Sequence, residues 1–285
     1  MKYEKDSVTV VLSGYKRPEF LREQITSIEN QSVKVDEILF WRNYHDNMNF
    51  DSDLINKCKS SLSNYNFGVW SRFTYSLNAK SEYVCIIDDD TIPGNRWIEN
   101  CLNSFKQKPG LYGTIGLRFS DSTTYLGANR YGWDGINNEE IVEVDIVGHS
   151  WFFKKIWLEN FWSEYSNKFP NNLAGEDIHF SYVIQKYLGL PTLVPKHPKN
   201  QPEFWGSLPK FAKELGQDKN SISTDPKSLV KFEKALQHYR KLGFVTKSEK
   251  SNKNSRYPTV IYWLIQKFPR TLHRIIKLRN KLNTF

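Results

Sequence analysis

The feature that most constrains the fold is a short apolar run that ends in three consecutive carboxylates. The run covers Tyr83 to Ile87, is rich in β-branched residues, and leads directly into Asp88, Asp89 and Asp90. Such a run predicts a strand that is buried on both faces of a parallel sheet. Open α/β sheets bind ligands at the carboxyl ends of their strands, and a divalent cation would relieve the repulsion among three adjacent acids. We therefore predict a metal site for a phosphate-bearing ligand here, with a solvated acidic turn as the alternative.

The composition indicates a globular protein from a reducing compartment. The chain has 285 residues, of which 39% are hydrophobic and 15% aromatic, too many for a disordered protein. Its three cysteines are too few for a disulfide framework, and Cys85 and Cys101 lie in apolar patterns that are typical of core thiols. The first apolar run, Val8 to Leu12, is too short for a secretory signal, and no later run approaches the ~20 residues of a membrane span. A cytoplasmic location is the resulting expectation.

The positive charge is concentrated at the carboxyl end of the chain. The net charge is +9, and the residues from Lys250 onward contain nine Lys or Arg and no acid, which leaves 31 basic and 31 acidic residues before them. A neutral main domain argues against a nucleic-acid-binding face. We divide the chain into a main domain, residues 1–245, and a helical tail, residues 246–285. Basic and apolar side chains fall on separate faces of a helix within 257–285, which suits an anionic membrane surface; the alternative is a tail that packs its apolar face on the domain.

The order of the predicted elements indicates a doubly wound α/β fold. Strands alternate with helices through the first half of the chain, and this predicts a mostly parallel central sheet flanked by helices. No GxGxxG or Walker lysine motif is present. A polar insertion is expected over 120–140, and a flexible segment that closes over donor phosphates over 200–224. The predicted strands cover 7–12, 36–41, 83–87, 111–117, 141–147 and 190–194, and the predicted helices begin near residues 18, 68, 97 and 176.

These motifs resemble those of GT-A glycosyltransferases, whose fold is Rossmann-like. The Asp88-Asp89-Asp90 strand end is similar to their DxD motif, and Gly175-Glu176-Asp177-Ile178 is similar to their second acidic motif. Within this class the chain resembles the exostosin-like family over about residues 7–200, through Tyr15-Lys16-Arg17, Trp41-Arg42-Asn43, Asn66 and Arg72. Two features depart from that family: the spacing from Asn66 to Arg72, and Gly175 where the family has cysteine. The second acidic motif equally suits the family 2 transferases, although their Gln-x-x-Arg-Trp motif is missing.

The resemblance implies a donor, a cofactor and a set of binding residues. Such enzymes transfer a hexosyl or N-acetylhexosaminyl group from a nucleotide-diphosphate sugar, typically a UDP-sugar, to a hydroxyl of a glycan or lipid-linked glycan, as in surface polysaccharide synthesis, with Mn²⁺ or Mg²⁺ stabilising the leaving diphosphate. Asp90 would bind the metal directly, Asp88 would reach the ribose or a metal-bound water, and Asp89 would lie near the donor sugar. The other nucleotide-sugar residues implied are Tyr15 and Asn43 at the base, Arg17 and Arg72 at the nucleotide or phosphates, and Asn66.

The resemblance also implies residues at the reacting centre. Asp177, with Glu176 beside it, would be the general base of an inverting enzyme or would lie near the anomeric carbon in a retaining one; the alternative is a helix cap. His197 is a candidate third metal ligand or, more simply, a surface histidine. His149 and Trp151 are candidate acceptor contacts. A competing hypothesis for the whole chain is a non-catalytic, metal-dependent sugar- or phosphate-binding domain that its tail recruits to membranes.

Overall fold

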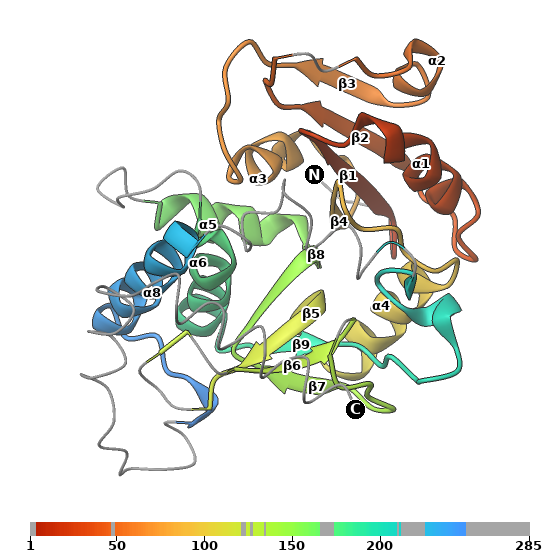
Figure 1. Ribbon diagram of the computed structural model, residues 1–285. Coiled ribbons are helices and arrows are strands. Elements are labelled where there is room, and N and C mark those ends of the chain that lie inside the picture. Colours follow the sequence, from red (N-terminus) through yellow and green to blue (C-terminus); the bar gives the residue numbers. More distant parts are fainter. Residues whose placement is uncertain are drawn as a thin grey trace.

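A single mixed sheet forms the centre of the molecule, with helices packed around it (Figure 1). The computed structural model describes residues 4–46, 49–120, 124–125, 128–133, 135–165, 174–209, 211 and 226–248. Within this part the sheet has nine strands in the order β3-β2-β1-β4-β8-β5-β9-β7, with β6 paired to β5. The predicted α/β class, with a central sheet flanked by helices, is confirmed.

The first half of the sheet is parallel. It contains β1 (Val8–Gly14), β2 (Glu37–Arg42), β3 (Lys59–Leu62) and β4 (Tyr83–Asp88), connected through α1 (Leu21–Glu29), α2 (Ser52–Ile55) and α3 (Ser71–Tyr75). Strands β1 and β4 are central and almost completely buried, which explains their continuous apolar sequences. Register pairs Ser13 with Asp88 and Gly14 with Arg42, so the carboxyl ends of the three strands lie at one edge. The order β3-β2-β1-β4 is the one that places a nucleotide at that edge in doubly wound folds.

The second half of the sheet mixes parallel and antiparallel pairs. Helix α4 (Trp97–Gln107) leads to β5 (Leu111–Arg118), followed by β6 (Asn129–Gly132), β7 (Val142–Val144), β8 (Ile146–Lys154) and, further on, β9 (Thr192–Val194). The single strand predicted over 141–147 is wrong, because this stretch forms β7 and the start of β8. Strand β8 continues to Lys154 and lies antiparallel between β4 and β5, where Trp151, Phe152 and Phe153 are buried on both sides of the sheet.

Four further helical segments pack beside the second half. Helix α5 (Leu158–Ser163) precedes α6 (Glu176–Val183), which continues into a π-helical turn over Ile184–Leu188. Helix α8 (Pro226–Lys241) packs on α6 through a small apolar cluster. In Figure 1, α5, α6 and α8 lie together on one side of β8, and α4 lies on the other. Short 3₁₀ turns cover Pro18–Phe20, Ser76–Asn78, Lys155–Trp157 and Pro202–Phe204.

The segment 202–208 is fixed against the turn that follows the acids, contrary to the prediction of a flexible segment. Gly94 N donates to Trp205 O at 2.9 Å, and Leu208 N donates to Ile92 O at 2.7 Å. A Cβ at Gly94 would lie 2.3 Å from Pro202 O, so only glycine permits this approach. The rest of the predicted closing segment, 210 and 212–224, lies outside the described residues.

Residues 249–285, and with them the predicted amphipathic stretch 257–285, lie outside the described residues. None of the helices in the described ranges is long and apolar enough to cross a membrane.

Candidate functional site

The carboxyl edge of the parallel half gathers the polar residues that the sequence singles out. Tyr15 and Arg17 follow β1, Asn43 follows β2, Asn66 follows β3, and the three acids end β4. The backbone of the acidic turn is held from α1, where the buried Gln24 side chain donates to Asp88 O at 2.7 Å and to Thr91 O at 3.1 Å. Sequence reasoning missed Gln24, although a polar residue on the apolar face of a helix was a signal that could have identified it.

Asp89 is turned back onto the loop after β1. Its Oδ1 accepts from Arg17 Nη1 at 2.7 Å, and its Oδ2 lies 3.3 Å and 3.2 Å from the backbone N–H groups of Tyr15 and Lys16. The Asp89 side chain is only 13% exposed. Asp89 and Arg17 therefore hold the β1 loop in place against the acidic turn, and the predicted contact of Asp89 with a donor sugar is replaced by this structural role.

Arg72 connects the two acidic motifs. From α3 its Nη1 donates to Asp88 Oδ1 at 2.7 Å, and its Nη2 donates to Glu176 Oε1 at 2.6 Å. The guanidinium also lies 4.4 Å from the centre of the Trp151 ring. Two carboxylates and an aromatic face surround Arg72, which is 7% exposed, so in this structure it bridges the two acidic motifs; its contact with nucleotide or phosphate groups stays a prediction. Trp151 is itself 1% exposed, so the prediction that it contacts an acceptor is wrong.

A series of hydrogen bonds joins Tyr15 and Asn43, the two residues predicted at the base, through Asn66. Asn43 Nδ2 donates to Asn66 Oδ1 at 2.8 Å, and Asn66 Nδ2 donates to the Tyr15 hydroxyl at 2.9 Å. The remaining acceptor, Asn43 Oδ1, takes the backbone N–H groups of Tyr44 and Phe67. The Tyr15 oxygen accepts within this series and keeps its own O–H for donation, so the series presents hydrogen-bond donors toward a ligand.

Asp90 is charged and is held by a histidine. Its Oδ1 lies 3.3 Å from His149 Nδ1 and accepts from the Thr91 hydroxyl at 3.0 Å, while its Oδ2 lies 4.0 Å from Arg17 Nη1. Burial alone would raise the pKa of Asp90, but His149 and Arg17 outweigh burial and hold this pKa well below its usual range. Burial alone would likewise lower the pKa of His149, and the Asp90 charge raises it instead. The Trp133 ring packs against His149 with 4.6 Å between ring centres.

Asp177 lies in the first turn of α6 and is half-buried. Its Oδ1 accepts from Ile178 N at 2.7 Å, and the helix cap is Gly175 rather than Asp177. The φ angle of Gly175 is 95°, a left-handed conformation that explains glycine where a cysteine was expected. Burial, and then the adjacent Glu176, raises the pKa of Asp177 to about 7. A carboxyl group with that pKa can accept a proton near neutral pH.

His197 has no ring nitrogen left for a metal. Its Nδ1 lies 2.8 Å from Pro195 O, and its Nε2 accepts from Gly206 N at 3.2 Å. It is 1% exposed and packs against Trp97, and burial lowers its pKa to about 4. This arrangement corrects both predictions for His197, because it is neither a third metal ligand nor a surface histidine.

The donor set at the strand end fits a hard divalent cation whose coordination the substrate completes. Across the described ranges, no group of three or more His, Cys, Asp or Glu side chains could hold a metal ion by itself. Asp88 and Asp90 each use Oδ1 for the protein contacts above, which leaves their Oδ2 atoms as carboxylate donors. Mg²⁺ is commonly bound by one or two carboxylates together with waters and substrate phosphates. The residues therefore fit such an ion only with a phosphate-bearing ligand beside it.

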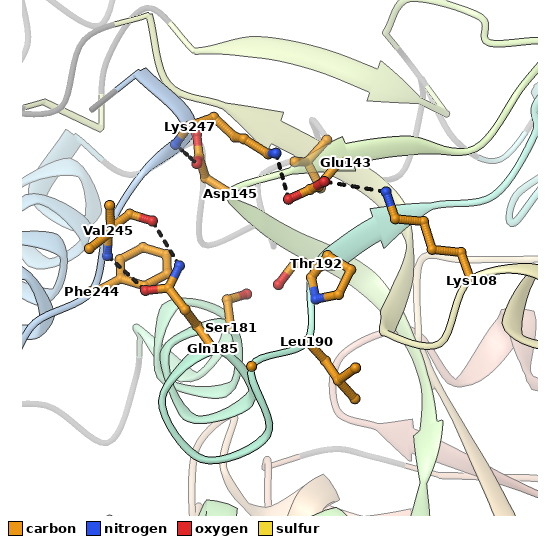
Figure 2. Close-up of a pocket in the computed structure, with 13 residues that line it drawn as sticks. Lys108, Glu143, Asp145, Ser181, Gln185, Leu190, Thr192, Phe244, Val245 and Lys247 are labelled. Carbon is orange, nitrogen blue, oxygen red and sulfur yellow. Dashed lines mark hydrogen bonds and ion pairs between the residues drawn. The ribbon is translucent and has the colours of Figure 1, made fainter. Parts of the chain in front are cut away.

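A cavity of about 470 Å³ lies elsewhere, at the amino ends of β5 and β9 (Figure 2). Strand β5 runs in the same direction as β4, since both are antiparallel to β8, so this cavity is at the sheet edge opposite the acids. Figure 2 shows Lys108 and Lys247 converging on Glu143, and Gln185 exchanging two 2.8 Å hydrogen bonds with the backbone of Val245. The Gln185 contacts attach the segment after α8 to the π-helical turn, Glu143 pairs with both lysines, and Asp145 accepts from the backbone N–H groups of Phe119 and Lys247.

Comparisons with known proteins give the following. The sequence matches no protein-family model and no curated protein. Among solved structures, the chain is similar to a crystal structure of residues 1–349 of S. aureus TarS, with 15% identity, a TM-score of 0.45, and coverage of 86% of this chain and 77% of that one. It is also similar to a second crystal structure of S. aureus TarS, with 13% identity, a TM-score of 0.48 and coverage of 96% of this chain; it spans 54% of that protein. A likeness at this level carries no conclusion about activity.

Proposed function

We propose that this chain is a metal-dependent glycosyltransferase of the GT-A type. Its reaction would transfer a sugar from a UDP-sugar to a hydroxyl group of a glycan or lipid-linked glycan, as in surface polysaccharide synthesis. The observation that carries the proposal is the Arg72 bridge, because it joins the acids that end β4 to the acids that begin α6. Arg72 and Glu176 are themselves 104 positions apart in the sequence. Two acidic motifs that are distant in the sequence are thereby held beside one ligand edge.

The donor's base would lie against the hydrogen-bonded side chains of Tyr15, Asn66 and Asn43. Since this series presents hydrogen-bond donors, it favours a base with a carbonyl oxygen in the recognised position, such as O4 of uracil. Cytosine has an amino group in place of O4 and offers no acceptor there to the Tyr15 O–H. A site built to hydrogen-bond one group rejects an analogue that lacks it, because buried polar groups are then left unpaired.

The diphosphate would lie at the acidic turn. Asp90 and Asp88 would hold Mn²⁺ or Mg²⁺ through their Oδ2 atoms, and the bound ion would stabilise the negative charge of the leaving diphosphate. Asp90 suits this role because its low pKa keeps it ionised. Arg17 and Arg72 would act indirectly, by fixing the acids that surround the ion.

Asp177 would act at the reacting centre. With a pKa of about 7 it can take the proton of the acceptor hydroxyl in an inverting reaction. In a retaining reaction, the same carboxylate would lie beside the anomeric carbon. Glu176 would hold Asp177 in place through its ion pair with Arg72.

Binding and transfer can be measured separately. Thermal shifts with UDP-, GDP- and CMP-sugars, each with Mn²⁺ and with EDTA, should show metal-dependent stabilisation by a UDP-sugar; stabilisation by none of them would refute the proposal. Asp177→Asn keeps the size of the side chain and removes its basicity, so nucleotide binding should persist while the turnover of donor falls by about 10²–10⁴-fold. A non-catalytic binding domain would instead show no donor turnover in either protein.

The tail would bring the enzyme to its acceptor. Residues 257–285 would bind an anionic membrane from the cytoplasmic side, where lipid-linked acceptors are present. Co-sedimentation with vesicles that contain anionic lipid, compared between the full chain and a chain ending at residue 248, tests this part alone. Equal binding by both chains would refute it.

A further inference from the structure

We propose that His149 is a positioning residue for Asp90, which fixes the carboxylate so that its Oδ2 faces the cation site. This inference rests on the proposed function. It assigns to His149 a role on the donor side of the site, instead of the acceptor contact expected from the sequence. Three features of the described residues lead to it: backbone conformation, strand register and side-chain contacts.

The backbone at His149 adopts a conformation that costs energy. Its φ is 63°, and the only other non-glycine residue with positive φ in the described ranges is Asp6, at 60°. Left-handed conformations disfavour residues with a Cβ, and they persist where the surrounding structure requires them.

The strand register shows how that conformation arises. Strand β8 pairs Trp151 with Gly113 and Gly148 with Ile115, so His149 and Ser150 together oppose the single residue Thr114. This is a β-bulge in the middle of the sheet, beside the acidic strand end. Bulges next to active sites re-aim a side chain that regular pairing would point elsewhere. Here the redirected side chain is the imidazole of His149.

The side chain then makes a defined contact. His149 Nδ1 lies 3.3 Å from Asp90 Oδ1, and the edge-on Trp133 ring packs against the imidazole. With the Thr91 hydroxyl on the same oxygen, Oδ1 has two donors, and the carboxylate cannot rotate without losing both. The other oxygen, Oδ2, is left toward Arg17 and the ligand edge. Groups that orient a metal ligand in this way typically change metal affinity by about 10–100-fold when removed.

Three variants of the full chain test the proposal, with Mn²⁺ affinity in the presence of UDP measured by electron paramagnetic resonance of the free ion. His149→Gly removes the imidazole and tolerates positive φ, so the fold should be retained, which its melting temperature checks. It should weaken Mn²⁺ binding by about tenfold or more. His149→Asn also tolerates positive φ, and its amide N–H can donate in place of Nδ1, so affinity should return to within about threefold of wild type. Asp6→Gly is the matched control for relief of strain and should bind Mn²⁺ as wild type does.

The outcomes separate the two levels of the hypothesis. If wild type and His149→Gly bind Mn²⁺ equally, the positioning role is overturned while the proposed function stands. If His149→Asn is as weak as His149→Gly, donation to Asp90 is not the cause, and the role is again overturned. If wild type binds no Mn²⁺ in the presence of UDP, the proposed function fails and the inference fails with it.

Discussion

Replacing Arg72 with methionine tests the bridge on which the site is built. The change removes two charge-assisted hydrogen bonds, of 2.7 Å to Asp88 and 2.6 Å to Glu176, and leaves the half-buried Asp88 and the buried Glu176 without their cation. Breaking a buried ion pair from one side costs about 3–5 kcal/mol. At about 1.7 °C per kcal/mol for a chain of 285 residues, the melting temperature should fall by at least ~5 °C. Methionine keeps an unbranched apolar side chain, so the loss reports the guanidinium, including its contact with the Trp151 ring at 4.4 Å.

The control is an ion pair of the same kind at the surface. Arg22 Nη2 lies 2.6 Å from Asp51 Oδ2, with side chains that are 65% and 39% exposed. Exposed pairs contribute about 0–1 kcal/mol, so Arg22→Met should change the melting temperature little. Both variants are to be melted in EDTA, at several pH values. The excess cost of Arg72→Met should grow as the pH rises through 7, because burial already raises the pKa of Asp88 to about 7 with Arg72 beside it, and removing that cation raises this pKa further. Equal effects of Arg72→Met and Arg22→Met, or an excess that does not depend on pH, would refute the reasoning.

Two further predictions concern the acid of α6 and the turn after β4. The pKa of Asp177 is raised to about 7 in the folded protein, so the folded state binds this proton more tightly than the unfolded state does. The stability gained from that proton is fully present below about pH 4 and is lost as the pH rises through 7. Asp177→Asn cannot titrate, so its melting temperature should rise relative to wild type across this range; a constant difference would contradict the assignment. Gly94→Ala should cost about 1–3 kcal/mol, because its Cβ would meet Pro202 O at 2.3 Å and Glu203 O at 2.5 Å, both backbone atoms that cannot rotate away. Gly148→Ala, where the nearest atom is 3.9 Å away, is its control, and equal melting temperatures for the two variants would exclude a tight backbone contact at Gly94.

The parallel half of the fold was predictable from the sequence because each of its strands carries its own signal. Continuous apolar runs mark β1 and β4 as central, and the polar residues that follow each strand mark the ligand edge. Once the strand order is doubly wound, residues after β1, β2 and β4 must meet at one edge. The meeting of Tyr15, Asn43 and the three acids follows from this order alone.

The antiparallel strand β8 was not predictable in the same way. Gly148-His149-Ser150 interrupts its apolar pattern, and a polar interruption of that kind is typical of a loop. The interruption is a bulge inside a strand, and only the pairing of β8 with β5 distinguishes the two cases. For the same reason the sequence indicated an acceptor loop for His149 instead of a contact with Asp90.

The partners of the charged side chains could not be predicted from the sequence either. Arg17 and Arg72 were expected to bind phosphate, since a guanidinium fork suits it. A carboxylate offers the same geometry, and which of the two an arginine meets depends on tertiary distances that motif spacing does not contain. His197 shows the same limit, because its burial and both of its hydrogen bonds come from segments around Pro195 and Gly206 whose folding the motif does not specify.

Asp90 and Asp177 both belong to acidic motifs, but their surroundings give the two carboxyl groups different pKa values. Asp90, beside His149 and Arg17, has a pKa below the usual range, whereas burial raises the pKa of Asp177 to about 7. Where two environments move the pKa values of acids apart, one acid suits a permanently charged role and the other a proton-transfer role. Arg72 lies between the two motifs and pairs with Asp88 and Glu176, whereas Asp90 lies beside His149 and 4.0 Å from Arg17. Within the described residues Asp177 has no arginine ion pair. The division of roles proposed for Asp90 and Asp177 therefore depends on which acids the arginines occupy, and substituting the arginines should disturb both roles together.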